Sequence, residues 1–357
     1  NSAAGTPDKH FDTLLYTGNG SVDHQIRGLN FQPDLVWVKR RASPGVEPYI
    51  YDSLRGAGRQ LYSSATSAEG LDTNRLTSFD PGGFTLGSHV DLNTDGKTAV
   101  AWCWKAGNET VVDNSGDLPC TRSTNVDAGF SIIMTEGTDA NNQKIPHGLG
   151  KAPEWILAKQ LDNTYNWDVF HVGCTAGSTL ILNSTATQDG TRDAFYNAGD
   201  GPVDSQFIYA KDEFVTSGGG KRTILYAWTS IEGYSKFGKY DTNTNDNGPF
   251  VYLGFKPAFV MVKTFSGSSN GNYWAWTIYD NKRVTNNPNH TPLYANHSIP
   301  EGYRGDGTTS SGGNTLYVDF LSNGFKLRNG GTEGNSNNAG DDVLYVAFAE
   351  MPFKYAN

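Results

Sequence analysis

Residues 28–39 read Gly-Leu-Asn-Phe-Gln-Pro-Asp-Leu-Val-Trp-Val-Lys, and the pattern recurs at residues 148–159 and 253–263. In each copy a proline is followed by residues of mostly strand-forming type and then by a lysine. Proline fits the start of a strand, where its missing N–H costs little, and β-branched and aromatic residues favour strands. We therefore expect three equivalent strands that end in Lys39, Lys159 and Lys263, with these lysines on the same face.

Further landmarks follow each copy in the same order. They are the segments Leu61-Tyr62-Ser63-Ser64, Ile181-Leu182-Asn183-Ser184 and Leu293-Tyr294-Ala295-Asn296; the pairs Glu69-Gly70, Asp189-Gly190 and Glu301-Gly302; and the closing segments Val100-Ala101-Trp102, Tyr226-Ala227-Trp228 and Val346-Ala347-Phe348. The copies are more than 100 residues apart, which is enough for each to bury its own core. The sequence therefore predicts tandem domains at residues 1–120, 121–233 and 234–357, with the polar segment 107–127 as a linker.

Glycine and asparagine are abundant between the apolar runs, with 42 glycines in 357 residues. Both residues favour turns that require positive φ, so many turns and many short strands are expected. The dipeptide Asp95-Gly96 predicts a tight hairpin. The expected fold is all-β, with three degenerate tandem β-sandwiches of jelly-roll or lectin-like type.

The net charge of −9, without a clustered Lys/Arg stripe, disfavours nucleic acid and anionic membrane surfaces as partners. No apolar run is long enough for membrane insertion. The three cysteines form no CxxC pair, so we expect buried free thiols and no zinc site. The segment 91–96 resembles the start of a calcium loop, but its twelfth position is Trp102 rather than Glu. The oxygen-rich segment 241–248 is better explained as a turn, so no metal and no cofactor is expected.

One polar arrangement occurs in two of the three copies. Asp52 and Arg55 in the first match Asp280 and Arg283 in the third, whereas the second copy has His171 at the aspartate position. An Asp and an Arg three residues apart commonly pair with each other or with the backbone. The functional alternative is a sugar site, where a carboxylate and a planar guanidinium bind hydroxyl groups.

The tryptophans suggest a second candidate surface. Trp102 and Trp104 share one face of a strand and are expected in the core. Trp274 and Trp276 follow a Gly/Ser/Asn-rich loop and are candidates for an exposed aromatic patch. We expect any receptor contact in loops of the third copy, at residues 265–273 and 286–309, although these loops could equally join strands or contact a neighbouring subunit.

No catalytic site is recognisable. The seven histidines are scattered, and no motif of the G-x-S-x-G kind pairs a nucleophile with a base. The expectation is a non-enzymatic protein, with a polysaccharide depolymerase as an alternative.

Several motifs together resemble a family of tailed-phage proteins that is common in marine and cyanobacterial phages. They are Phe31-x-Pro33-Asp34-Leu35-Val36-Trp37-Val38-Lys39, Tyr51-Asp52-Ser53-Leu54-Arg55-Gly56-Ala57, Ala101-Trp102-Cys103-Trp104-Lys105-Ala106-Gly107, Gly233-Tyr234-Ser235-Lys236-Phe237-Gly238 and Pro352-Phe353-Lys354-Tyr355-Ala356. Members carry a domain of unassigned function, often in proteins called tail fibre or structural protein. The resemblance brings no catalytic or ligand residues with it.

The resemblance implies a protein of the virion surface, made in the host cytoplasm, most simply a tail fibre or similar appendage that attaches to the host. Partners would be other virion proteins, further copies of the chain as a homotrimer, and a host surface glycan. The alternatives are a capsid decoration (cement) protein and a secreted lectin.

Overall fold

A computed structural model of the chain describes residues 6–41, 46–192, 194–195, 203–211, 219–266, 275–302, 317–328, 337 and 340–350. Its described elements are strands, apart from the 3₁₀ turn η1 (Pro7–Lys9) and the one-turn helix α1 (Val90–Asn93). The all-β class is thereby confirmed. No helix in these ranges is long and apolar enough to cross a membrane.

The first repeat, called unit 1, contains a six-stranded main sheet and a three-stranded small sheet, both antiparallel. The main sheet has the order β1 (Phe11–Thr17), β9 (Thr98–Trp104), β3 (Leu35–Arg40), β4 (Tyr49–Asp52), β5 (Arg59–Tyr62) and β6 (Gly70–Leu71). The small sheet has the order β2 (His24–Arg27), β8 (Gly83–Leu86) and β7 (Leu76–Asp80).

Unit 2 repeats this plan with two extra strands at one edge of the main sheet, no counterpart of β6 at the other edge and one strand fewer in the small sheet. Its main sheet has the order β10 (Val111–Asp113), β11 (Cys120–Asn125), β12 (Phe130–Glu136), β18 (Arg222–Trp228), β14 (Trp155–Gln160), β15 (Trp167–His171) and β16 (Leu180–Ile181), and its small sheet pairs β13 (Gln143–Pro146) with β17 (Phe207–Ala210). The linker expected at residues 107–127 is therefore wrong, because this segment supplies β10 and β11 to the sheet of unit 2. Its polar composition suits β10, which forms the largely exposed edge, and β11 beside it, most of whose residues are only partly buried.

Unit 3 has a five-stranded main sheet and a three-stranded small sheet. The main sheet has the order β19 (Ser235–Asp241), β26 (Asp342–Ala349), β21 (Pro257–Ser266), β22 (Thr277–Asp280) and β23 (Leu293–Tyr294). The small sheet has the order β20 (Phe250–Tyr252), β25 (Gly324–Leu327) and β24 (Val318–Leu321).

The central strands of each main sheet are buried on both faces. In β3, Val36 and Val38 pack against the small sheet of unit 1, whereas Leu35 and Trp37 point to the opposite side. Successive side chains of a strand alternate between faces, so an uninterrupted apolar run supplies two cores at once. The same division holds for β14 and β21, which explains why all three strands are buried throughout most of their length.

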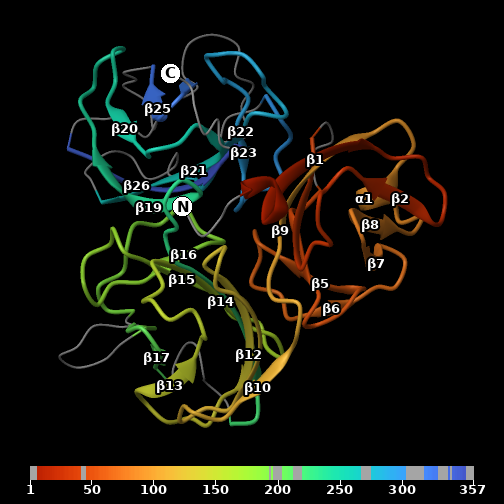
Figure 1. Ribbon diagram of the computed structural model, residues 1–357, viewed down its shortest axis with the longest axis vertical. Coiled ribbons are helices and arrows are strands. Elements are labelled where there is room, and N and C mark those ends of the chain that lie inside the picture. The colour runs from red at the N-terminus through yellow and green to blue at the C-terminus, as the bar shows by residue number, and fades with distance from the viewer. Residues whose placement is uncertain are drawn as a thin grey trace.

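The three main sheets share one central core (Figure 1). Three aromatic residues at equivalent positions meet there. The ring centroid of Trp104 in unit 1 lies 6.1 Å from that of Trp228 in unit 2 and 5.5 Å from that of Phe348 in unit 3. The ring of Phe11 on the first strand also stacks on Phe348 on the last, at 5.1 Å. The units are therefore three lobes around a common core, not separate sandwiches that each enclose all of their apolar surface.

One backbone hydrogen bond recurs at each of the three seams between units. The amide N–H of Glu69 donates to Leu161 at 2.8 Å, that of Gln188 to Phe265 at 3.0 Å, and that of Glu301 to Arg41 at 2.7 Å. Unit 1 is thus joined to unit 2, unit 2 to unit 3 and unit 3 to unit 1, which closes the ring. In unit 2 the residue at this position is Gln188 rather than Asp189, so the expected match was displaced by one residue.

The three strand-end lysines are equivalent, as expected. Lys39 lies opposite Val100, Lys159 opposite Ile224 and Lys263 opposite Leu344, and all three partners belong to the shared core. Two of these lysines bridge seams: Lys39 Nζ donates to Ser298 O at 2.7 Å, and Lys263 Nζ donates to Ala186 O at 2.9 Å.

The hairpin expected at Asp95-Gly96 is wrong. This dipeptide joins helix α1 to β9, and the N–H of Gly96 donates to Gly18 O at 3.0 Å. The turn chemistry was recognised correctly, but the preceding element is a helical turn rather than a strand.

Candidate functional site

The Asp–Arg turn of unit 1 is buried in the seam with unit 2. Asp52 Oδ2 accepts from Arg55 Nε at 2.5 Å and from the hydroxyl of Tyr226 in unit 2 at 2.6 Å. Arg55 Nη1 also lies 3.3 Å from Glu69 Oε1. Burial opposes the charged guanidinium, but Asp52 and Tyr226 outweigh this effect and raise the pKa of Arg55. These groups are therefore committed to one another.

The turn of unit 3 repeats this geometry in the seam with unit 1. Asp280 Oδ2 accepts from Arg283 Nε at 2.5 Å and from the indole N–H of Trp102 at 3.1 Å. Arg283 Nη1 lies 2.9 Å from Glu301 Oε1. Burial again opposes the charge, and the two carboxylates more than offset it and raise the pKa of Arg283. Trp102 and Tyr226 occupy equivalent positions, opposite Trp37 and Leu157.

Unit 2 makes the same seam contact with a neutral side chain. His171 Nε2 lies 3.0 Å from the carbonyl oxygen of Tyr345 in unit 3, and His171 Nδ1 accepts from the N–H of Gly173 at 3.0 Å. A carbonyl oxygen can only accept, so the proton is on Nε2. Burial lowers the pKa of His171 to about 4, which keeps the ring neutral.

The candidate sugar residues Asp52, Arg55, Asp280 and Arg283 are therefore not gathered at an open surface. The structure places the two pairs in different seams, where their side chains have no exposed area. The internal pairing that the sequence left open is the arrangement found, because each pair holds one unit to the next.

The exposed aromatic patch is also not formed by Trp276. This residue is fully buried in the shared core, and its indole N–H donates to Ile181 O of unit 2 at 3.0 Å. Trp274 lies outside the described residues. Trp102 and Trp104 are buried, as expected from their shared face.

The two oxygen-rich segments use their side chains within the protein. Asp91 accepts from Tyr49 and lies 3.1 Å from Arg75 Nη2, and the fully buried Asn93 donates to Ser21 O at 2.7 Å. In the later segment, Asn243 Oδ1 accepts from the N–H of Asn245 at 3.0 Å. Across the described ranges, no group of three or more His, Cys, Asp or Glu side chains is placed to hold a metal ion.

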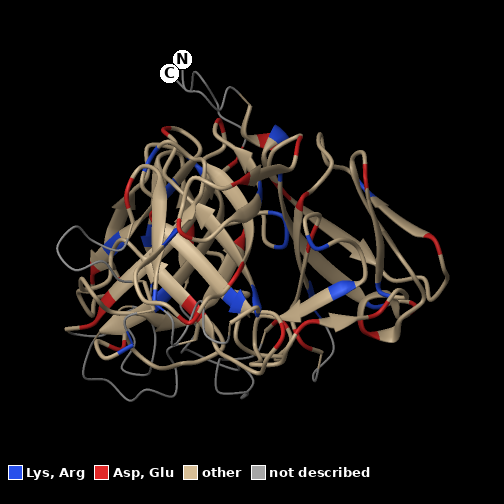
Figure 2. Ribbon diagram, turned by 90° about the horizontal axis from the view of Figure 1, so that it is seen from below, with Lys and Arg blue, Asp and Glu red and all other residues tan. Residues whose placement is uncertain are grey.

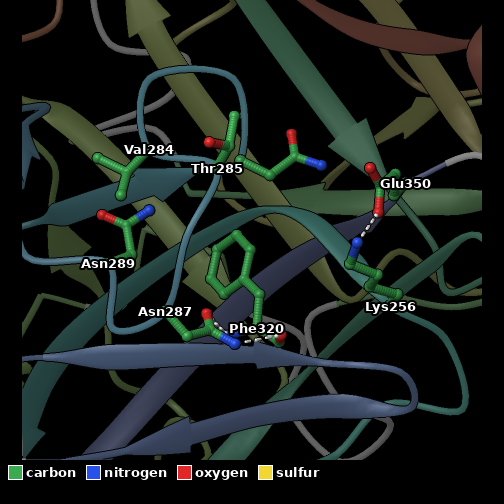
Figure 3. Close-up of a pocket in the computed structure, with 8 residues that line it drawn as sticks. Lys256, Val284, Thr285, Asn287, Asn289, Phe320 and Glu350 are labelled. Carbon is green, nitrogen blue, oxygen red and sulfur yellow. Dashed lines mark hydrogen bonds and ion pairs between the residues drawn. The ribbon is translucent and has the colours of Figure 1, made fainter.

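A small polar cavity in unit 3 is the strongest candidate for a ligand site (Figure 3). Its volume is about 190 Å³. The ring of Phe320 lies among the side chains that surround it, and the Lys256–Glu350 pair stands at one side. The lining residues are Lys256, Asn281, Val284, Thr285, Asn287, Asn289, Phe320 and Glu350.

A longer loop in unit 3 helps to form this cavity. Asp52 and Asp280 occupy equivalent positions at the ends of β4 and β22. Gly58 and Asn289 are also equivalent: the N–H of Gly58 donates to Leu76 O and that of Asn289 to Val318 O, both at 2.8 Å. Between these fixed points the loop covers residues 53–57 in unit 1 and the longer span 281–288 in unit 3. The extra residues include Asn287, so the shared fold does not require this part of the cavity wall.

Two of the lining asparagines hold the loop in place. Asn287 Nδ2 donates to Phe320 O and Asn287 Oδ1 accepts from the N–H of Phe320, both at 2.9 Å. Asn289 is 2% exposed and donates to Asp280 O at 2.9 Å. The loop is therefore pinned to β24 and to the end of β22, which gives the cavity a fixed shape.

Three further polar residues line the cavity and do not hold the loop in this way: Asn281, Lys256 and Glu350. The buried Oδ1 atom of Asn281 has no hydrogen-bond partner. Its counterpart Ser53 donates to Asp34 Oδ1 at 2.8 Å, but unit 3 has Ala258 in place of that aspartate. Lys256 Nζ and Glu350 Oε2 form an ion pair of 2.6 Å in which both side chains remain partly exposed.

This arrangement suits a small, neutral, polyhydroxylated ligand such as a single sugar ring. Asn281 offers a buried acceptor, the ion pair offers a donor and an acceptor whose charges cancel, and Phe320 contributes an apolar surface. Binding sites for polar ligands commonly combine apolar walls with a few fixed polar groups, and a buried polar atom without a partner gains from a ligand hydroxyl.

The sequence pointed only in part to this site. Of the loops expected to carry a receptor contact, residues 265–266 and 286–302 are described, and the second range supplies Asn287 and Asn289. Lys256, Phe320 and Glu350 were missed because they come from segments far apart in the chain. An internal comparison with unit 1 is the signal that could have found two of them, since unit 1 has Gln32 and Ala106 where unit 3 has Lys256 and Glu350, whereas Phe320 matches Phe79 and would not stand out.

Comparison with known proteins gives one match. The model of a family described as a domain of unknown function (DUF7483) matches residues 6–352. This range includes all three units, in agreement with their shared core. No curated protein and no solved structure matches the chain.

Proposed function

Because the chain belongs to the DUF7483 family, whose function is unassigned, we propose a role from its own residues. In this role the protein is a structural component of a tailed-phage virion and forms part of a tail fibre or similar appendage. It contacts a host surface glycan through the unit 3 cavity. The phage assignment rests on the motif resemblance, and the glycan contact rests on the cavity. The partners in this proposal are other virion proteins and further copies of the chain.

The observation that carries the binding role is that a loop held rigidly on a buried scaffold lines a polar cavity and includes Asn281, whose buried Oδ1 has no hydrogen-bond partner. Unit 1 has the smaller Ser53 there, with its hydroxyl group already bonded. Attachment proteins need such preformed sites, because a rigid site loses little conformational entropy on binding.

The distribution of charge also supports a glycan rather than a polyanion for this site. Acidic and basic residues are interspersed along the ribbon (Figure 2), and the net charge is −9. The proposed role is binding without catalysis. The charged groups of both Asp–Arg turns already bind partners in the seams between units, so they do not serve as catalytic groups in this proposal.

A glycan array probed with the full-length protein tests the binding role. We expect binding to one class of array sugar, and we expect Asn281→Ala and Lys256→Ala to weaken it about tenfold or more, as for loss of a hydrogen bond to a charged or buried group. Gln32→Ala changes the equivalent exposed position of unit 1 and is the matched control. Equal binding by all three variants, with melting temperatures unchanged, would remove the cavity from consideration.

Capsid decoration is the second candidate, and the ring of three similar units favours it. A chain with three equivalent lobes can contact three neighbouring shell subunits around a local threefold axis. Immunogold labelling of intact particles separates the two roles: label on the tail supports the appendage, and label on the head supports decoration.

A further inference from the structure

Two aromatic side chains lie exposed on the small sheet of unit 3, away from any core. Phe250 and Tyr252 on β20 have exposed fractions of 44% and 59%, whereas Val251 between them is buried. Residues two apart on a strand share a face and lie roughly 6.7 Å apart. The ring of Phe250 covers Gly324, where a Cβ would come within 3.1 Å of the ring atoms. The same Cβ would clash with the backbone oxygen of Val251, so the glycine is required first by the backbone of β20 and also leaves room for the ring.

The other units show that the fold does not need aromatic residues here. Val251 opposite Phe325 corresponds to Ile26 opposite Phe84 in unit 1, so Phe250 and Tyr252 correspond to Gln25 and Arg27. Both of these unit 1 residues are exposed and polar. In unit 2 the corresponding residues are Lys144 and Pro146. The aromatic pair is a special feature of unit 3.

Two lysines flank the rings. Lys236 Nζ lies 5.3 Å from the centroid of the Tyr252 ring and donates to Tyr252 O at 2.8 Å. Lys326 lies directly opposite Phe250 on β25 and donates to Gly248 O at 2.8 Å. An ammonium group has three donors, so each lysine retains donors for a ligand. Asp319 lies opposite Lys326 on β24 and pairs with Arg328. The surface formed by Phe250, Tyr252, Lys236 and Lys326, called the aromatic strip, is therefore locally positive, although the protein as a whole is acidic.

We propose that Phe250 and Tyr252, with Lys236 and Lys326, form a second binding site that takes an acidic polysaccharide chain. Successive sugar rings would stack their apolar faces on the two aromatic rings, and carboxylate groups of the chain would accept from the two lysines. Charge complementarity selects an acidic chain over a neutral one, because both rings have a lysine beside them. This site is separate from the cavity and does not depend on it.

Affinity electrophoresis of the full-length protein through gels containing alginate, an acidic polyuronate, tests the proposal. We expect retardation in alginate and much weaker retardation in neutral dextran. The key variant is Phe250→Gln with Tyr252→Arg, which gives unit 3 the residues that unit 1 carries. It adds a positive charge, so an interaction by charge alone would be kept or strengthened, whereas an interaction that needs stacking falls about tenfold or more.

A second variant, Lys236→Gln, is expected to reduce both the retardation and its dependence on salt. The cavity variant Asn281→Ala is expected to behave as the native protein, which separates this site from the one proposed above. Native-like retardation of the Phe250/Tyr252 variant, or no retardation of the native protein in alginate, would overturn the proposal. So would sedimentation showing that the native chain self-associates through these rings and that the variant does not.

Discussion

The imidazole of His171 in unit 2 donates a hydrogen bond from Nε2 to the carbonyl oxygen of Tyr345 in unit 3, across 3.0 Å. At the equivalent positions of the other seams, Asp52 and Asp280 accept from the side chains of Tyr226 and Trp102. Unit 3 carries Val346 where the other units carry Tyr226 and Trp102, so no side-chain donor exists there. The seam residue is therefore a donor to the backbone in unit 2 and an acceptor in units 1 and 3.

Protonation of His171 should weaken the fold. Its pKa is about 4 in the folded chain, against 6.5 as the ordinary value. Between these values the unfolded chain binds more protons, so the free energy of unfolding falls as pH falls from 6.5 to 4. We expect a loss of about 3 kcal/mol from this residue. Urea denaturation at a series of pH values measures it, and His171→Gln, which retains an N–H donor, should flatten the curve. An identical pH dependence in that variant would contradict the assignment.

Breaking the buried charge cluster of unit 1 should cost more than removing one of its hydrogen bonds. Arg55→Met leaves the buried Asp52 without its counter-charge, whereas Glu69 keeps Arg59 and Arg222, and a loss of about 3–5 kcal/mol is expected. Tyr226→Phe removes only the hydroxyl donor to Asp52, with an expected loss of about 1.5–3 kcal/mol. Chemical denaturation of both variants gives the comparison. A smaller loss for Arg55→Met than for Tyr226→Phe would show that the cluster does not hold the seam.

Trp276 should behave as a core residue. Replacement by Ala leaves a cavity in the shared core and removes the hydrogen bond to Ile181 O, so we expect about 3–5 kcal/mol of destabilisation. Replacement of the exposed Tyr252 by Ala should change the unfolding free energy by about 0.5 kcal/mol or less. Thermal and denaturant unfolding of the two variants check this contrast, and equal stability would place Trp276 on the surface after all.

A single unit should not fold alone. A fragment of residues 1–106 would expose Trp37, Trp102 and Trp104, which are buried only when the other main sheets are present. We expect such a fragment to retain strand signals in far-ultraviolet circular dichroism, lose near-ultraviolet signals and bind the dye ANS. The full-length chain is the control. A fragment with a cooperative unfolding transition of its own would mean that the small-sheet core is sufficient.

The repeat pattern predicted the strands well, because alternation and proline placement are local properties. The equivalence of Lys39, Lys159 and Lys263 followed from their fixed distance to a proline. The shared core could not be predicted. A strand that is buried on both faces has the same apolar sequence pattern whether its second face packs against its own unit or against another unit. For the same reason Trp276 was expected on the surface: the loop before it is polar, but its indole packs against a different unit.

The candidate site was harder to predict than the fold. Asp52 and Arg55 stood out because charged residues at a repeated spacing suggest chemistry, yet their partner Tyr226 lies far along the chain in another unit. The cavity residues Lys256, Phe320 and Glu350 carry no motif and are assembled by the packing of β21, β24 and the end of β26. A comparison of the repeats shows that unit 3 differs from unit 1 at Lys256 and Glu350, but only the three-dimensional structure brings these positions together with Phe320.

The shared core also limits how such a chain can evolve. Exchange of one unit with that of a related chain would alter two seams at once, and the incoming seam side chains would need partners on both neighbouring units. In unit 2, His171, Cys174 and Gln188 stand at the positions of Asp52, Arg55 and Glu69 of unit 1. All three charges of the seam are therefore absent together, which avoids an unpaired buried charge. We therefore expect differences between related chains to concentrate in the outer loops and small sheets, where unit 3 differs from unit 1 in its cavity and in Phe250 and Tyr252.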